Sequence, residues 1–310
     1  MSFSEKVFWW RLGFISFPDF EDFFFEKLAE LGINKVAVEY SPEKSDERNF
    51  YVWLPSNEWL QHEREGLVNT LKQIAESLNW PISAVKWERI EEEDWSKSWK
   101  QYWEPDAVGK NLLILPAWLE PPEELSHRLI LRLDPGCAFG TGSHPTTRLC
   151  LEALENDPPV NLRVADLGCG SGILSLAALG LGAKEVLAVD IDSLAIRTSL
   201  QNQKLNKAFK GNFSAFIGSV DVLMEELKGN PADLLLCNIL APVIEQLAPS
   251  FHDLLSPNGR ALLSGLLFDQ SAGLAKLLNS LGWEVSNCLL KDQWGLLEIS
   301  QPKRQNQFIS

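Results

Sequence analysis

The first ninety residues alternate between apolar and polar positions with two different periods. Strand-like runs rich in aromatic and β-branched residues fall at 7–12, 35–40, 50–54 and 84–90. Apolar positions spaced three or four apart predict helices at 20–31 and 58–78. The order strand-helix-strand-strand-helix-strand predicts a ferredoxin-like α+β domain over residues 1–92. A fold of this kind does not by itself indicate a function.

The pattern changes in a connector that we place at residues 93–110. Trp95, Trp99 and Trp103 recur every four residues and would form one stripe along a helix that ends at Pro105. We interpret the stripe as a surface that packs between two domains. A cation-accepting aromatic surface is the alternative interpretation.

Beyond the connector, short apolar runs alternate with helical segments. Strands are predicted at 112–115, 129–133, 164–167, 185–190, 216–222, 232–237, 262–265, 283–289 and 294–299. Helices are predicted at 144–154, 173–179, 194–205 and 270–281. Strands that are apolar throughout are typical of a parallel sheet covered on both faces. We therefore predict a doubly wound, Rossmann-like α/β domain over residues 111–302 with an antiparallel finish, and a disordered tail at 303–310.

The composition of the 310 residues is that of a globular protein, with 45% hydrophobic and 23% charged residues. No apolar run approaches the length of a membrane span, and the N-terminus lacks the order of a signal peptide. The five cysteines form no C-x-x-C pair and the four histidines form no zinc pattern. We expect reduced thiols, no metal, no membrane association and a cytoplasmic monomer.

The net charge restricts the partners of this chain. It is −14, with an isoelectric point of about 4.8. Tight binding to nucleic acid usually relies on a basic surface. The charge therefore argues against direct nucleic-acid binding and mildly favours a basic substrate.

The first candidate site lies where the predicted strand at 164–167 enters a glycine-rich turn. Gly168, Gly170 and Gly172 follow the spacing G-x-G-x-G, and glycines let backbone approach a ligand closely. Asp190 ends the next predicted strand, where a carboxylate can accept hydrogen bonds from a ribose diol. These features predict a β-α-β unit that binds a nucleoside.

Asp166 helps to choose between the nucleosides that this unit could bind. Ile173 stands where a dinucleotide-binding loop has its third glycine. A carboxylate of Asp166 at the mouth of the loop would repel the pyrophosphate of NAD, whereas S-adenosylmethionine carries a sulfonium and an ammonium and no phosphate. We therefore favour S-adenosylmethionine. In the alternative interpretation, Asp166 only orders the turn and Asp190 is an ordinary strand-end acid.

Two further strands would deliver polar residues to the same edge of the sheet. Asp221 is predicted near the end of the strand at 216–222, where contacts to an adenine edge would fall. Asn238 follows the strand at 232–237, and ligands of open α/β sheets bind at the carboxyl ends of the strands.

A second glycine-containing loop, at 134–147, leads into the predicted helix at 144–154. Ser143 is the predicted N-cap of this helix, and Pro145 suits its first turn. The free backbone donors of a helix N-terminus and the glycines allow such a loop to fold over a ligand. A plain strand-to-helix connection is the alternative.

Four segments carry a resemblance when they are read together. They are Asp134-Pro-Gly-Cys-Ala-Phe-Gly-Thr-Gly-Ser-His-Pro-Thr-Thr147, Asp166-Leu-Gly-Cys-Gly-Ser-Gly-Ile173, Asp190-Ile-Asp192 and Asn238-Ile-Leu-Ala241. The chain resembles the PrmA family, whose members methylate the eleventh protein of the large ribosomal subunit. Asp94-Trp95…Trp99-Lys100 and Leu115-Pro-Ala-Trp118 match as well, so the resemblance covers nearly the whole chain.

This resemblance implies a class I methyltransferase sheet that uses S-adenosylmethionine and releases S-adenosylhomocysteine. It also implies that the N-terminal domain binds the ribosomal protein. The resemblance and the motifs together give the predicted donor-binding residues: Phe139, Thr147, Asp166, Gly168, Gly170, Asp190, Asp221 and Asn238.

Asn238 is the predicted catalytic residue. Methyl transfer from a sulfonium needs a neutral amine, which here would be a lysine side chain, an N-terminal α-amine or both. A carboxamide cannot act as a base, but its oxygen can accept an N–H bond and aim the amine. A desolvated pocket beside a sulfonium would lower the pKa of that amine.

Other functions fit the same residues less well. A nucleic-acid N-methyltransferase normally carries an aromatic residue after the fourth strand to clamp a flipped base, where this chain has Ile239-Leu240-Ala241. A methyltransferase of another small substrate is a further alternative. A non-catalytic adaptor would not need the intact set of site residues. An NAD dehydrogenase is disfavoured because Asp166 would repel a pyrophosphate and Ile173 stands where the third glycine is needed.

Overall fold

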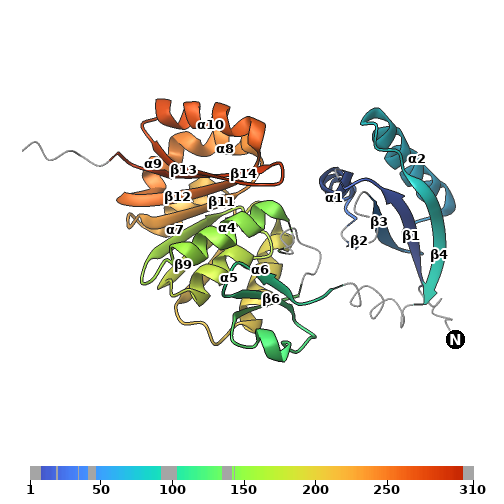
Figure 1. The fold of residues 1–310 in the computed structure, drawn as a ribbon, viewed down its shortest axis with the longest axis horizontal. Coiled ribbons are helices and arrows are strands. Elements are labelled where there is room, and N and C mark those ends of the chain that lie inside the picture. Colours follow the sequence, from blue (N-terminus) through green and yellow to red (C-terminus); the bar gives the residue numbers. More distant parts are fainter. Residues whose placement is uncertain are drawn as a thin grey trace, which may run out of the picture. The chain divides into compact units, whose positions relative to one another are not determined.

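The chain divides into two compact units, Met1–Glu104 and Pro105–Ser310. The structure is a computed structural model that describes residues 8–18, 20–33, 35–40, 47–91, 103–134, 142 and 144–302 (Figure 1). The boundary between the units falls inside the predicted connector at 93–110. The predicted tail at 303–310 and two members of the tryptophan stripe, Trp95 and Trp99, lie outside the described residues.

The first unit has the predicted ferredoxin-like order of elements. These are β1 (Phe8–Ser16), α1 (Phe20–Glu30), β2 (Val36–Tyr40), β3 (Arg48–Pro55), α2 (Gln61–Ser77) and β4 (Ser83–Glu91). The strands form one antiparallel sheet in the order β2-β3-β1-β4. β1 continues past its predicted end because the buried alternation of Leu12, Phe14 and Ser16 carries on through Gly13.

The core of this unit is built from aromatic side chains on one face of the sheet. Phe14 stacks on Phe50 with ring centroids 5.1 Å apart, and Phe24 meets the ring of Phe50 edge-on at 4.8 Å. Leu67 and Leu71 of α2 close the same cluster. Helices α1 and α2 therefore cover one face of the sheet and do not cover the other face.

The second unit contains a long mixed sheet with the order β10-β9-β8-β11-β12-β14-β13 and a small sheet with the order β5-β6-β7. The elements before the glycine-rich turn are β5 (Asp106–Val108), β6 (Leu112–Pro116), η2 (Glu123–Leu125), β7 (Leu129–Leu133), α4 (Pro145–Asn156) and β8 (Arg163–Leu167). Those that follow are α5 (Ile173–Gly180), β9 (Glu185–Asp190), α6 (Ser193–Leu205), β10 (Asn212–Ile217), α7 (Val220–Leu227), β11 (Ala232–Asn238), α8 (Ala241–Leu247), η3 (Ala248–Ser250), α9 (Phe251–Leu254), β12 (Leu255–Leu267), α10 (Phe268–Ser280), β13 (Glu284–Lys291) and β14 (Trp294–Ser300).

This arrangement confirms the predicted doubly wound sheet and its antiparallel finish. Strands β8 to β12 pair in parallel, and β14 runs antiparallel to both β12 and β13. β5, which has three residues and pairs with β6, was not predicted. No described helix is long and apolar enough to cross a membrane.

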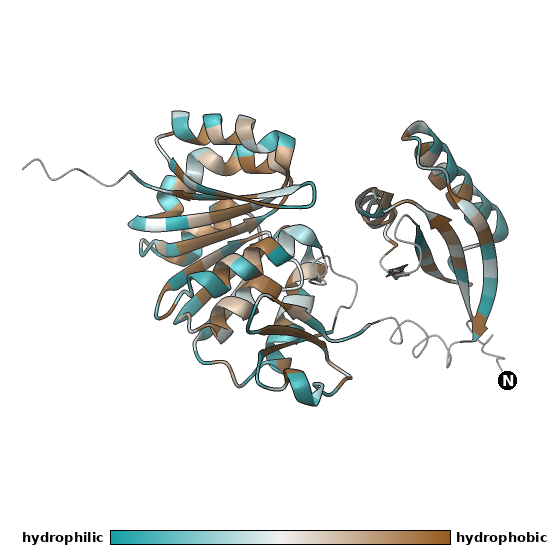
Figure 2. Cartoon of the chain, in the orientation of Figure 1, coloured by the Kyte–Doolittle hydropathy of each residue, from teal (hydrophilic) through white to brown (hydrophobic). Residues whose placement is uncertain are grey.

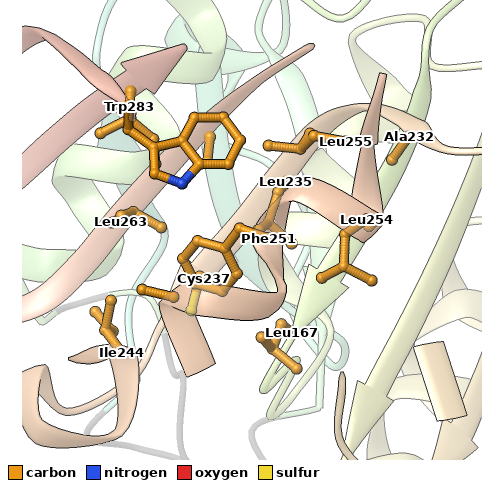
Figure 3. Close-up of a cluster of buried hydrophobic side chains, with 14 of the residues drawn as sticks. Leu167, Ala232, Leu235, Cys237, Ile244, Phe251, Leu254, Leu255, Leu263 and Trp283 are labelled. Carbon is orange, nitrogen blue, oxygen red and sulfur yellow. The ribbon is translucent and has the colours of Figure 1, made fainter. Parts of the chain in front are cut away.

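Helices cover both faces of the long sheet, so its strands are buried on two sides. Residues alternate along β8: Ala165 and Leu167 share a buried cluster with residues of α8 and α10, whereas Val164 shares one with residues of α4 and α5. Figure 2 shows the central strands as almost continuously hydrophobic. On the first face, the rings of Phe251 and Trp283 pack among the aliphatic side chains of the strands (Figure 3).

The order of the strands determines where a ligand can bind. The chain passes from β8 outward to β9 and β10, and then returns to the other side of β8 to form β11. In open α/β sheets, a crevice forms at such a switch point, outside the carboxyl ends of the strands. The loops that follow β8 and β11 are therefore expected to line the site.

Candidate active site

The loop after β8 takes a left-handed backbone conformation at all three glycines. Gly168, Gly170 and Gly172 have φ angles of 78°, 53° and 80°, which side-chain-bearing residues rarely adopt. A Cβ at Gly168 would collide with Ile239, and a Cβ at Gly172 would lie 2.9 Å from Cβ of Ser199. Packing against neighbouring elements therefore requires two of these glycines, in addition to any close approach of a ligand.

Asp190 ends β9 as predicted, and its carboxylate braces the glycine-rich loop. One oxygen accepts the N–H of Gly170 at 2.9 Å and the other accepts the N–H of Asp192 at 2.9 Å. The loop is also held by the N–H of Gly168, which donates to the carbonyl of Val189 at 2.9 Å. Each carboxylate oxygen keeps a second acceptor site, so Asp190 can hold the loop and accept ribose hydroxyls together.

Two exposed isoleucines flank Asp190. Ile191 is 80% exposed and Ile217 is 59% exposed. Ile217 lies opposite Asp190 in the register of β10 with β9. Apolar side chains at the rim of a polar site are suited to hold the flat face of a base. Asp190 and these isoleucines together fit a nucleoside.

Asp166 does not lie at the mouth of the loop, contrary to the prediction. The residue is 1% exposed, and its Oδ2 accepts a hydrogen bond from Oγ of Ser175 on α5 at 2.6 Å. Alternation along β8 turns Asp166 toward α5, on the same face as Val164. Burial raises the pKa of Asp166 from 3.8 to about 7; the hydrogen bond from Ser175 opposes this shift, and the nearby Asp190 adds to it.

Asn238 ends β11 and meets α4. Its Nδ2 donates to Oγ1 of Thr147 at 3.3 Å, and Thr147 is fully buried in the first turn of α4. Among the described residues none donates to Oδ1 of Asn238, and a carboxamide oxygen is a hydrogen-bond acceptor. Because Cys237 pairs with Leu167, Asn238 and Gly168 come next on adjacent strands.

The residue after Asn238 joins the two loops. The side chain of Ile239 occupies the space that a side chain at Gly168 would need, and its backbone lies against Gly265 of β12, where a Cβ would be 2.9 Å from the nitrogen of Ile239. Pro242 then takes the first turn of α8, a favourable position for proline. The glycine-rich loop and the Asn238 loop thus pack directly on each other.

The loop before α4 is described only in part. Phe139 and the predicted N-cap Ser143 lie outside the described residues. The N-cap of α4 is His144, whose Nδ1 accepts from the backbone N–H of Thr146 at 3.3 Å. Pro145 opens the helix as predicted, and Gly142 packs against Ile173 at the start of α5, where a Cβ would come within 2.9 Å.

The predicted strand at 216–222 is wrong, and with it the place of Asp221. β10 ends at Ile217, Gly218 has a φ angle of 155°, and α7 begins at Val220. Asp221 is exposed in the first turn of α7, where an acidic side chain favours the helix dipole. Asp221 is therefore not on a strand, and its predicted contact with an adenine edge stays a prediction.

The thiols near the site are buried. Burial raises the pKa of Cys150 to about 12 and raises the pKa values of Cys169 and Cys237 as well. These thiols are therefore protonated and poor nucleophiles at neutral pH. The described cysteines are unbridged, and the described residues contain no group of three or more acidic, histidine or cysteine side chains that could hold a metal ion.

Sequence reasoning missed Ser175, the partner of Asp166. It is the one polar side chain in the apolar helix Ile173–Gly180. A buried polar group needs a partner, so this isolated serine was a usable signal. Sequence reasoning also missed Asn202, which contacts the glycine-rich loop from α6.

A parallel switch-point sheet, a glycine-rich loop, a strand-end acid and a strand-end asparagine that faces the loop define the class of this protein. It is a class I methyltransferase, which uses S-adenosylmethionine as the methyl donor. The comparisons with known proteins agree with this class and give the family.

The model of the family "Ribosomal protein L11 methyltransferase (PrmA)" matches residues 9–302. A protein named ribosomal protein L11 methyltransferase from Prochlorococcus marinus (strain MIT 9303) is 52% identical over 301 residues, which cover 97% of this chain and all of that protein. One of the same name from Parasynechococcus marenigrum (strain WH8102) is 54% identical over 284 residues, 92% of this chain and 98% of that one. The chain belongs to the PrmA family.

A solved structure supports the same assignment. The ribosomal protein L11 methylase from Lactobacillus delbrueckii subsp. bulgaricus superposes with a TM-score of 0.58 and 32% identity. The match covers 64% of this chain and 99% of that chain.

Proposed function

We propose that this chain transfers methyl groups from S-adenosylmethionine to amino groups of ribosomal protein L11, at lysine side chains, the N-terminal α-amine or both. The observation that carries the proposal is the geometry of Asn238. Its Nδ2 is held by Thr147, and its Oδ1 has no described donor at a point where β11 ends beside the loop at Gly168. An acceptor held in this way beside a donor-binding loop can orient an amine.

The residues of the site fit a nucleoside with a cationic end. When bound, S-adenosylmethionine supplies an electrophilic methyl group on a sulfonium sulfur. Asp190 would accept hydrogen bonds from the ribose hydroxyls of S-adenosylmethionine, and the glycine-rich loop would lie against the rest of that molecule. The negative charge of Asp190 helps to raise the pKa of the buried Asp166, and the same negative field favours a cation over a phosphate.

In this proposal the side chain of Asn238 orients the substrate amine and does not act as a general base. A carboxamide oxygen accepts one N–H of the substrate amine and so directs the nitrogen lone pair away from itself. A pocket that excludes water favours the neutral amine, which is the reactive form. Proximity and orientation would then supply most of the rate.

The first unit is the proposed recognition domain for ribosomal protein L11. On the sheet face not covered by α1 and α2, Arg11, Tyr51, Lys86 and Glu88 line a groove. The guanidinium of Arg11 pairs with Glu88. A groove with aromatic and mixed charged side chains suits a protein segment better than a nucleic-acid backbone, and it agrees with the net charge of −14.

The proposal includes a cytoplasmic location, because ribosomal protein L11 is a ribosomal component. It also includes action as a monomer without direct nucleic-acid binding. Ile239, which a base-clamping enzyme would replace with an aromatic residue, is packed between Gly168 and Gly265. Light scattering in solution tests whether the protein is a monomer.

Replacement of Asn238 by alanine tests the catalytic assignment. We expect the turnover number on ribosomal protein L11 to fall about thirty-fold or more, roughly 2 kcal/mol in the barrier, which is the scale of one preorganised polar contact. Mass spectrometry of ribosomal protein L11 incubated with enzyme and labelled donor gives the rate and identifies the modified amines.

The control is Asn287→Ala, which removes the same side chain from an exposed position on β13. It should leave turnover unchanged. Full turnover by a folded Asn238→Ala variant would refute the role of Asn238. Wild-type enzyme that leaves every amine of ribosomal protein L11 unmodified would refute the proposed function itself.

A further inference from the structure

Helix α6 carries two buried asparagines on one face, four residues apart. They are Asn202 and Asn206, the second being the C-cap residue. Asn206 faces β7, the edge strand of the small sheet, and Asn202 faces Asp134, the residue that follows β7. Residues four apart on a helix are neighbours, so the two side chains contact the end of β7 and the residue after it in succession.

Asn206 acts as a partner for the strand edge. Its Oδ1 accepts the N–H of Arg132 at 2.9 Å, and its Nδ2 donates to the carbonyl of Arg132 at 2.7 Å. One side chain thus satisfies both backbone groups of one residue, as an added strand would. This contact stabilises the end of β7 and does not reach the glycine-rich loop.

Asn202 makes a different pair of contacts. Its Oδ1 accepts the N–H of Asp134 at 2.9 Å, and its Nδ2 donates to the carbonyl of Ser171 at 2.9 Å. Ser171 lies between Gly170 and Gly172 in the glycine-rich loop. Asp134 is the residue at which the second loop of the site leaves β7. One fully buried amide therefore ties the bases of both loops together.

The glycine-rich loop needs such a restraint from outside. Three glycines give it more backbone freedom than other sequences have, and that freedom must be lost when a ligand is bound. From β9, Val189 and Asp190 hold N–H groups of the loop. From α6, the backbone and Cβ of Ser199 occupy the space that a side chain at Gly172 would need, and Asn202 holds the carbonyl of Ser171.

We propose that Asn202 is a positioning residue for donor binding, which fixes the glycine-rich loop in its binding conformation by tying it to Asp134 at the end of β7. The inference rests on the proposed donor site at the glycine-rich loop. Asn202 itself does not touch the donor in this proposal. It acts through the carbonyl of Ser171.

The substitution Asn202→Asp isolates the contact with the loop. It keeps the size of the side chain and the acceptor for Asp134, but once the new carboxyl group is ionised it places a carboxylate oxygen against the carbonyl of Ser171. The matched control is Asn206→Asp, the same chemical change one turn further along α6. That control breaks the bonds from Nδ2 of Asn206 to the carbonyl of Arg132 and to the backbone carbonyl of Asn202, and it spares Ser171.

Calorimetry with S-adenosylmethionine should separate the two variants. We expect Asn202→Asp to raise the donor Kd about ten-fold or more at pH 8, with a matching rise in donor KM and little change in kcat at saturating donor. Asn206→Asp should change the donor Kd less than three-fold, although it also lowers the unfolding midpoint. The KM for ribosomal protein L11 should not change in either variant.

The pH dependence provides a readout that general loss of stability would not give. In the Asn202→Asp variant, the new carboxyl group can again donate a hydrogen bond to the carbonyl of Ser171 once it is protonated. The ratio of variant to wild-type Kd should therefore fall toward one as the pH is lowered. Asn202→Ala, which adds no buried charge, should weaken binding at every pH and serves where the aspartate variant does not fold.

The outcomes are distinct. An unchanged donor Kd in folded Asn202→Asp or Asn202→Ala overturns the inference and leaves the proposed function in place. Equal losses of affinity in the Asn202 and Asn206 variants overturn it as well, since they indicate a general effect on the fold. A wild-type protein that does not bind S-adenosylmethionine overturns both the inference and the proposed function.

Discussion

The buried acid Asp166 makes stability depend on pH in a direction opposite to that of most acidic residues. Its pKa is raised from 3.8 to about 7, primarily by burial. Below pH 3.8 the group is protonated in both the folded and the unfolded chain. Between pH 3.8 and 7 the unfolded chain releases the proton while the folded chain keeps it, so the free energy of unfolding falls as the pH rises. Above pH 7 both states are ionised and the loss is complete.

The size of the effect follows from the width of that interval. A rise of about three pH units, at about 1.4 kcal/mol per unit, removes ~4 kcal/mol of stability by pH 8. Asp166→Asn abolishes this titration and keeps an oxygen that can accept from Ser175. The variant should therefore gain up to about 4 kcal/mol relative to wild type between pH 4 and pH 8.

The measurement compares the two proteins without donor. Hydrogen exchange of peptides that cover β8, followed along a urea series at each pH, reports the free energy of unfolding of the second unit alone. The other acidic groups of the chain titrate in both proteins, so they cancel in the difference.

Asp221→Asn is the control, because it removes one acid from an exposed helix turn. It should not reproduce the rise. A difference between Asp166→Asn and wild type that stays constant from pH 4 to pH 8 would refute the reasoning.

Two further predictions concern the donor and the division between the units. Asp190→Ala should weaken binding of S-adenosylmethionine ten- to a hundred-fold, about 1.5–3 kcal/mol, because the ribose contacts and the hydrogen bond from the N–H of Gly170 are both lost. Unchanged affinity in calorimetry contradicts this role. A chain of residues 105–310 should bind the donor with near wild-type affinity and lose most activity on intact ribosomal protein L11. That start keeps β5, whose Asp106 pairs with Arg148 of α4; a full rate from the shortened chain would contradict a recognition role for the first unit.

The periodic parts of the fold were predictable because burial imposes the period. In β1, Leu12 and Phe14 alternate with partly exposed residues, and in α2 the buried Leu67 and Leu71 are four apart. Where the prediction failed, the cause is local. The run that follows Phe216 is apolar enough for a strand, but Gly218 turns the chain and the buried residues beyond it have a helical spacing.

The residues of the site could be predicted from the sequence, but the contacts between them could not. Asn238 and Thr147 were both singled out, yet the bond between them joins residues 91 positions apart, and nothing in either segment specifies it. The burial of Asp166 was missed for a related reason. β8 is covered on both faces, so it has no polar side, and its sequence does not tell which side chain faces a helix.

The glycine-rich loop shows how far a motif can be interpreted. Gly168 and Gly172 were predicted to be small so that a ligand could approach, but Ile239 and Ser199 already occupy the space beside them. Their spacing is therefore a requirement of the strand-turn-helix unit, which many nucleoside-binding folds share. The choice of ligand has to come from groups that the loop does not contain. In this chain those groups are the carboxylate of Asp190 on β9 and the amide of Asn238 on β11, and for that reason the combination of segments indicated a function that the loop alone did not.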